Sequence, residues 1–424
     1  AMANVLIKGN NLYSNYWLQD VFNGDYNVGK RMLVGIVYSP IYLEPSLSDH
    51  VECRERLQGI LEKLIVVGEE YFNWVDPIKP SESILQFVHN KNNDRHRDGT
   101  VWHNYLMDVK RASKIFEERQ GQYDSSTGPS ELRYESYDVA LLSVGGVLRA
   151  VDYVLKEPAK SAVSAWSLGR PPGHLANNKI CIFNNIAIGA HYAMRRYNIH
   201  RILIVDCDAH HGKHTAYVFR SDPNVLYFSM HIEGDYAKEE GTVDVIGDGE
   251  GKGYTFNLQY PKNMDDDGYI YMIDGLLIPV AKEFAPELIM ISAGFDGHFE
   301  DDLTPGCILT ERAYIHLAKK LKELASSFNI KIVGALEGGY GLESMVNSFV
   351  HMINIIGDWK VPEDKIGFVK GSENRKISPD AFKRVKEEVK TRVRLMKQTK
   401  EENSTGYRLF SDIDHWNKIL NAEL

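Results

Sequence analysis

Short apolar runs rich in β-branched residues alternate with longer amphipathic stretches along most of this chain. The apolar runs are nearly continuous, which is typical of strands that are buried on both faces of a parallel sheet. We therefore predict strands over residues 31–38, 201–206, 224–231, 288–294 and 330–337.

The amphipathic stretches repeat their apolar positions with the period of an α-helix. In residues 137–156, for example, one face collects Ala140, Leu141, Val144, Val147, Leu148, Val151 and Val154. Similar patterns predict helices over residues 186–197, 268–283, 311–327 and 342–356. Because strands and helices alternate over this length, we predict an α/β fold with three α/β/α layers and a mainly parallel central sheet.

Two regions depart from this alternation. Residues 76–130 are polar and rich in turn-forming residues, and we expect an excursion of loops and short helices within the same domain. After about Asp358 the strand pattern stops. The chain thus divides into a predicted α/β domain over residues 1–358 and a predicted C-terminal helical extension over residues 359–424.

The extension begins with a highly charged helical pattern over residues 379–400 and ends in an aromatic tail. The tail contains Tyr407, Phe410 and Trp416. We expect it to pack back on the domain, and contact with another subunit is the alternative. The sequence does not determine the quaternary state, so a homo-oligomer remains open.

Composition excludes several classes of partner. The chain has 424 residues, of which 43% are hydrophobic and 25% charged, as in globular proteins. Its formal net charge of −9 argues against a nucleic-acid partner, which requires a basic surface. No segment approaches the roughly 20 apolar residues that a membrane span needs.

The cysteines and the N-terminus point to the cytoplasm. The four cysteines lie far apart without a C-x-x-C pair, which argues against a zinc finger or a redox motif; they are Cys53, Cys181, Cys207 and Cys307. Reduced thiols are typical of cytoplasmic proteins. The first residues lack a basic start followed by an apolar run, so we predict no signal peptide.

Residues with metal-binding chemistry follow two of the predicted strands. The 201–206 strand leads into Asp208 and His210, and the 288–294 strand leads into Asp296. Ligands bind at the carboxyl ends of the strands in open parallel sheets, so these side chains can converge. Two carboxylates and one imidazole suit a divalent first-row metal and leave a coordination position open for catalysis. In the alternative, these residues only cap helices and bond to loop backbone. That alternative would be preferred for a single motif of this kind, but the second acidic strand end favours a metal site.

Two further residues have chemistry that suits a metal-assisted reaction. His174 follows a rigid Arg-Pro-Pro-Gly turn, and a positioned histidine beside a metal can act as general acid or base. Tyr340 follows two glycines that give the backbone the freedom to direct the phenol towards an oxyanion. Taken singly, each residue also fits a purely structural role.

Together these segments resemble the zinc-dependent histone deacetylase superfamily, which includes acetoin-utilisation proteins and acetylpolyamine amidohydrolases and shares the arginase fold. The resemblance covers about residues 37–356. It includes the motifs His50-Val-Glu-Cys-Arg-Glu-Arg-Leu, Arg170-Pro-Pro-Gly-His, Phe183-Asn-Asn, Asp206-Cys-Asp-Ala-His-His-Gly, Ser292-Ala-Gly-Phe-Asp and Leu336-Glu-Gly-Gly-Tyr, in the order typical of the family.

The resemblance implies a role for each residue of the site. Asp208, His210 and Asp296 would bind one zinc ion. Tyr340 would polarise the scissile amide carbonyl, and Asp206 would orient His174. The positions that match a potassium ion of the family are Asp206, Asp208, His210, Ser229 and Met230. The substrate would be a small acylated amine or an acyl-lysine peptide.

The chain departs from the family pattern beside the expected metal. Where the family has a second histidine, usually assigned as the general base, this chain has Leu175. The usual Asp or Asn partner of that histidine is replaced by Lys213. Ile180 stands where a phenylalanine often lines the acyl-lysine channel, and Leu303 matches another apolar channel position.

Two functions therefore remain open. The first is a zinc-dependent amide hydrolase in which His174 alone transfers protons. The second is a catalytically impaired, deacetylase-like protein that binds metal and ligand. An arginase-like ureohydrolase is disfavoured, because it would need an additional ligand set for a second metal and no such set accompanies these motifs.

Overall fold

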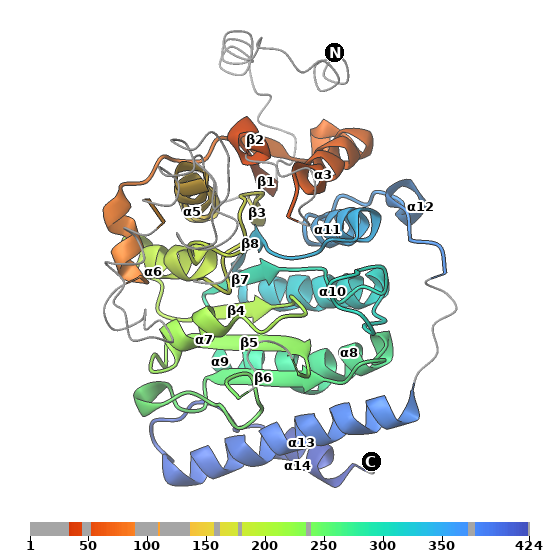
Figure 1. The fold of residues 1–424 in the computed structure, drawn as a ribbon. Coiled ribbons are helices and arrows are strands. Elements are labelled where there is room, and N and C mark those ends of the chain that lie inside the picture. Colours follow the sequence, from red (N-terminus) through yellow and green to blue (C-terminus); the bar gives the residue numbers. More distant parts are fainter. Residues whose placement is uncertain are drawn as a thin grey trace, which may run out of the picture.

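Eight parallel strands form one sheet in the order β2-β1-β3-β8-β7-β4-β5-β6 (Figure 1). The structure is a computed structural model that describes residues 34–44, 52–89, 109–110, 136–156, 162–176, 180–234, 239–371 and 378–422. The strands are β1 (Val34–Val37), β2 (Asn73–Val75), β3 (Ser164–Ser167), β4 (Ile202–Asp206), β5 (Val225–Ile232), β6 (Thr255–Tyr260), β7 (Leu288–Ala293) and β8 (Lys331–Leu336).

The central strands are apolar throughout because each contributes to two hydrophobic cores. In β4, Leu203 and Val205 join one core, whereas Ile202 and Ile204 join the other. Successive side chains of a strand point to opposite faces of the sheet, so a strand covered on both sides requires an unbroken apolar run.

Helices cover both faces and complete the predicted three-layer α/β/α fold (Figure 1). One layer contains α5 (Ser136–Leu155), α6 (Asn185–Tyr197) and α7 (Lys213–Phe219). The opposite layer contains α3 (Arg54–Val67), α8 (Asp266–Met272), α9 (Ile278–Phe284), α10 (Glu311–Phe328) and α11 (Leu342–Ile356). After α11 come α12 (Glu363–Ile366), α13 (Pro379–Glu402) and α14 (Ile413–Asn421).

The sequence pattern did not predict three of the strands, β2, β3 and β6. β2 and β3 have only three and four residues. In β6, apolar and polar residues alternate as Thr-Phe-Asn-Leu-Gln-Tyr, because this strand lies at the edge of the sheet. Its pattern therefore differs from the continuous runs of the central strands.

The helix predicted over residues 268–283 is interrupted in the middle. A π-helical turn, Ile273–Leu277, separates α8 from α9. Pro279 has no N–H to donate to the Gly275 carbonyl four residues earlier, which disfavours a regular α-helix here. The Gly275 carbonyl instead lies 3.3 Å from Nε2 of His415 in α14.

Part of the predicted excursion over residues 76–130 lies outside the described residues. The described part includes the 3₁₀ helix Glu82–Phe87. Among the described helices, none has the length and apolar character needed to cross a membrane.

The aromatic tail packs back on the α/β layers, as predicted. Tyr407, Phe410 and Trp416 are buried, and the indole N–H of Trp416 donates to Glu283 in α9. Figure 1 shows α13 running beneath the edge strand β6, with α14 beside it. The division of the chain at residue 358 stays a prediction.

The strand register brings the predicted site residues together at the carboxyl ends of the central strands. Asp206, the last residue of β4, lies between Ser229 of β5 and Ser292 of β7. Ala293 of β7 pairs with Leu336 of β8. The loops that follow β4, β7 and β8 therefore begin side by side.

Candidate metal centre

Asp208, His210 and Asp296 meet above the carboxyl ends of β4 and β7. One ligand atom from each lies within 4.8 Å of the others, and this is the one such group of three or more His, Cys, Asp or Glu side chains among the described residues. The two carboxylates are buried, and the His210 side chain is 14% exposed. The predicted ligand set is therefore assembled at a site that solvent reaches from the His210 side.

Backbone N–H groups of the loops that follow β4 and β8 hold the two carboxylates in place. Asp208 accepts hydrogen bonds from the N–H of His210 at 2.9 Å and of Gly338 at 2.8 Å. Asp296 accepts one from the N–H of Ala209 at 2.7 Å. The loops after β4, β7 and β8 are thus joined through the ligands themselves.

Glycines make room for this close approach. A Cβ atom at Gly294 would lie 2.1 Å from Oδ2 of Asp208, and one at Gly338 would lie 2.6 Å from the same oxygen. Any side chain at these positions would displace the carboxylate, which explains the Gly residues beside two acidic strand ends.

The electrostatics of the ligand set favour a cation. Burial and the neighbouring Asp208 raise the pKa of Asp296 to about 7. Burial would lower the pKa of His210, but Asp296 and Asp208 outweigh it and raise that pKa to about 12. Two buried carboxylates this close therefore retain a proton between them unless another positive charge compensates, and a divalent ion fits that requirement.

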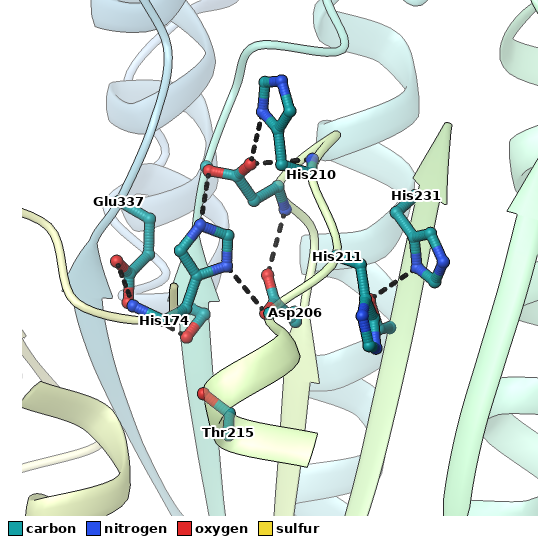
Figure 2. A network of polar contacts seen from close by, with 12 residues as sticks. His174, Asp206, His210, His211, Thr215, His231 and Glu337 are labelled. Carbon is teal, nitrogen blue, oxygen red and sulfur yellow. Dashed lines mark hydrogen bonds and ion pairs between the residues drawn. The ribbon is translucent and has the colours of Figure 1, made fainter. Parts of the chain in front are cut away.

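His174 lies beside the ligand set and is 3% exposed. Its Nδ1 is 3.0 Å from Oδ2 of Asp206, and its Nε2 is 3.6 Å from Oδ2 of Asp208 (Figure 2). Tyr227 also donates a hydrogen bond to Oδ2 of Asp206 at 2.9 Å. The predicted pairing of His174 with Asp206 thus appears in the structure, and Tyr227 adds a contact that the sequence did not indicate.

Negative charge surrounds His174. Burial alone would lower the pKa of its imidazole, but Asp206, Asp208 and Glu337 outweigh burial and raise the pKa well above its ordinary value. The protonation state of His174 therefore depends on which other positive charges neutralise these carboxylates.

Glu337 is a site residue whose role the sequence did not reveal. Its buried carboxylate accepts hydrogen bonds from the N–H groups of Gly173 at 2.7 Å and His174 at 3.2 Å, and from the hydroxyl of Ser292 at 3.1 Å. Figure 2 shows Glu337 beside His174. The only sequence signal was an acidic residue at the end of β8.

Tyr340 lies half-buried after the Gly338-Gly339 turn, on the same edge of the sheet. Gly339 has a φ of 116°, a conformation that favours glycine. The guanidinium of Arg56 lies 4.8 Å from the centre of the Tyr340 ring and donates to the Gly339 carbonyl at 2.7 Å. Arg56 belongs to α3, far away in the sequence, and its contact could not be predicted.

The family model for the histone deacetylase domain matches residues 50–356, most of the chain. The chain belongs to the histone deacetylase family. A probable deacetylase of Archaeoglobus fulgidus is 34% identical over 322 residues, which cover 74% of this chain and 82% of that protein.

Other family members come from plants and animals. The human polyamine deacetylase HDAC10 is 37% identical over 336 residues, covering 74% of this chain and 46% of that protein. Histone deacetylase 5 of Arabidopsis thaliana is 32% identical over 343 residues, covering 77% of this chain and 49% of that protein. This chain spans about half the length of these plant and animal relatives. The HD domain of HDA15 shares the fold, with a TM-score of 0.72 at 23% identity over 93% of this chain and 100% of that one.

The residues that replace or match the family's channel and general-base positions follow β3, β4 and β7 in the chain. Leu175 and Ile180 are half-buried, and Leu303 is 39% exposed. Residues 177–179, between the first two, lie outside the described residues. Lys213, the first residue of α7, forms an ion pair of 2.5 Å with Glu240. The lining of a substrate channel by the three apolar residues stays a prediction.

Two of the expected potassium ligands, Asp206 and Ser229, lie side by side on neighbouring strands. Ser229 is the register partner of Asp206, and Met230 follows it on β5. The Ser229 hydroxyl is 2.9 Å from Nδ1 of His231, whose Nε2 is 2.8 Å from the Gly241 carbonyl. Since that carbonyl can only accept, Nε2 carries the proton and Nδ1 accepts from Ser229. The Ser229 hydroxyl therefore donates to His231.

Proposed function

We propose that this chain is a zinc-dependent amide hydrolase that removes an acetyl or other acyl group from an amine. The observation that carries the proposal is the Asp208, His210 and Asp296 set beside the His174–Asp206 pair. Membership of the deacetylase family supports the same reaction class. One zinc ion would be held by the three side chains, whose types match its preferred ligands.

When bound, zinc would polarise the scissile carbonyl, lower the pKa of the attacking water and offset the carboxylates that raise the pKa of His174. Nε2 of His174 faces this position and would take the proton as water adds to the carbonyl carbon. The same nitrogen would then deliver the proton to the leaving amine as the C–N bond breaks. The products are a carboxylic acid and a free amine.

Asp206 and Tyr340 would support these steps. Nδ1–H of His174 would donate a hydrogen bond to Asp206, which would fix the imidazole so that Nε2 faces the substrate. Burial raises the pKa of Tyr340 well above its ordinary value, so the phenol keeps its proton and can donate it in a hydrogen bond to the oxyanion.

The proposed substrate is a small acylated amine or an acyl-lysine side chain. Leu175, Ile180 and Leu303 would form the apolar lining for the acyl group and its linear chain. We further propose potassium at the Ser229 position, with Asp206, Asp208, His210 and Met230 as the other ligands; the pairing of Ser229 with Asp206 in neighbouring strands supports it.

A second function is favoured by two specific residues. Leu175 cannot transfer a proton, and the Lys213 side chain is engaged by Glu240. Loss of a general base typically lowers the rate by roughly 10²–10⁴-fold. The alternative is therefore a protein that binds metal and acylated ligand with little turnover.

Turnover by the purified, zinc-loaded protein separates the two functions. Fluorogenic acetyl-lysine and longer acyl-lysine peptides should be assayed together with N-acetylputrescine. Hydrolysis that disappears in Asp208→Ala and His174→Ala would support the hydrolase. Zinc binding without hydrolysis of any of these amides would support the binding protein.

The replaced residues give a sharper test. The Leu175→His, Lys213→Asp double variant should increase kcat by about 10-fold or more, because it restores a general base and its carboxylate partner. Lys213→Asp alone is the matched control and should not increase kcat. An unchanged kcat in the double variant would show that the missing histidine does not limit this site.

A further inference from the structure

The carboxylate of Asp301 connects the turn that carries Tyr340 to the loop that carries Leu303. Oδ2 accepts hydrogen bonds from the backbone N–H of Tyr340 at 2.6 Å and of Gly341 at 3.2 Å. Oδ1 accepts one from the N–H of Leu303 at 3.0 Å. Asp301 is only 3% exposed, so these backbone donors take the place of water around its carboxylate.

The turn from Glu337 to Gly341 depends on such external partners. It contains three glycines, and glycine leaves the backbone with more freedom than any other residue. Neither a helix nor a strand supplies hydrogen bonds to the N–H groups of Tyr340 and Gly341. Asp301 supplies them, while Arg56 binds the carbonyls of Glu337 and Gly339 from the other side.

Asp301 is also tied to the metal ligands along the chain. It lies five residues after Asp296, and its N–H donates to the His298 carbonyl at 2.9 Å. A shift of Asp301 would therefore move Tyr340 relative to the Asp208, His210 and Asp296 set. A displacement of about 1 Å in a positioned group can lower a rate by roughly 10²-fold.

We infer that Asp301 is a positioning residue that holds Tyr340 in place relative to the metal centre and joins the Tyr340 turn to the loop that carries Leu303. This inference rests on the proposed function, because it assumes that Tyr340 contacts the carbonyl oxygen of the substrate. Asp301 acts through the backbone N–H groups of Tyr340, Gly341 and Leu303, and its charge also interacts with that of Arg56.

The test compares Asp301→Asn with Asp302→Asn, because Asp302 is a neighbouring exposed aspartate and the N–H groups of Tyr340 and Gly341 donate to Asp301 instead. An asparagine retains one acceptor and places an N–H₂ group against backbone N–H donors. In Asp301→Asn, kcat should fall about 10- to 100-fold while KM and zinc affinity change less than about threefold. Asp302→Asn should match the wild type.

A double variant distinguishes positioning from general damage. If Asp301 acts through Tyr340, the Asp301→Asn, Tyr340→Phe protein should be no more than about threefold slower than Tyr340→Phe alone. Multiplied effects of the two substitutions would overturn the inference. Asp301→Glu keeps the carboxylate and should retain more activity than Asp301→Asn. If the Asn variant does not fold, the same comparison is made with Asp301→Glu.

A binding measurement keeps this test separate from the proposed function. Acetohydroxamate binds metal and presents a carbonyl oxygen, so its affinity for the zinc-loaded protein reports the Tyr340 contact without turnover. Asp301→Asn, Tyr340→Phe and the double variant should all weaken it to a similar extent, and Asp302→Asn should not. Wild-type affinity in Asp301→Asn would overturn the inference. Wild-type protein that binds the hydroxamate without hydrolysing any amide would contradict only the hydrolase proposal.

Discussion

Single residues determine whether the metal centre can form. Its acidic ligands are packed so closely against backbone that glycine is required at Gly294 and Gly338. Backbone N–H groups hold Asp208 and Asp296 in place, and the imidazole of His210 lies 2.7 Å from Oδ2 of Asp296. The geometry of the expected ligands is therefore a property of the loops, and a small change in a loop residue would reach the proposed metal site.

Gly294→Ala should lower zinc affinity by about 10- to 100-fold, the range seen when groups around metal ligands are disturbed. The new Cβ would lie 2.1 Å from Oδ2 of Asp208 and force the carboxylate away. Competition with a chelator measures the effect. Gly275→Ala is the matched control, because its Cβ would meet no atom closer than 3.9 Å. Equal zinc affinity in the two variants would contradict this account.

At the level of secondary structure elements, α13 covers the open edge of the sheet. The edge strand β6 has backbone groups that no further strand can pair with. Arg392 of α13 donates to the carbonyls of Gly253 at 2.9 Å and Thr255 at 3.0 Å, and Glu388 accepts from the N–H of Gln259 at 3.1 Å. The guanidinium of Arg392 also lies 3.6 Å from the centre of the Phe256 ring.

Arg392→Met should therefore lower the free energy of unfolding by about 1–3 kcal/mol, because a buried carbonyl loses its donor. Urea unfolding followed by circular dichroism measures the change. The control is Arg394→Met on the same helix, whose ion pair with Glu387 is exposed and should contribute less than about 1 kcal/mol. If Arg392→Met were as stable as Arg394→Met, the helix would not depend on this contact to cover β6.

At the level of the whole molecule, stability should depend on pH through the same interface. Burial raises the pKa of Glu388 to about 7, and the nearby Asp244 and Glu233 add to this effect, while Gln259 and Arg384 oppose it. A folded-state pKa above the unfolded value means that the stabilisation is fully present below about pH 4.5 and lost as pH rises through 7.

Glu388→Gln should remove this contribution. Between pH 5 and 8 the wild type should lose about 1–2 kcal/mol more of its free energy of unfolding than the variant, after allowance for the partial exposure of Glu388. Urea unfolding at several pH values tests the difference. Parallel pH profiles for the two proteins would contradict the assignment to Glu388.

Much of the α/β core and of the ligand set could be predicted because both depend on local patterns. Continuous apolar runs indicate strands buried on both faces, and parallel strands end at one edge, so acidic residues after β4 and β7 were expected to meet. The structure brings together Asp208, His210 and Asp296 as expected. It also places Asp206 against His174.

The supporting contacts required the tertiary structure. Glu337 accepts from Gly173, 164 residues earlier in the chain, and Asp301 accepts from Tyr340, 39 residues later. Their partners are backbone N–H groups, which every residue except proline possesses, so no residue type in the sequence marks them. The pairing of Arg392 with β6 is hidden in the same way. Periodicity reveals which face of an element is buried, but only the folded chain decides which distant backbone a buried charge will bind.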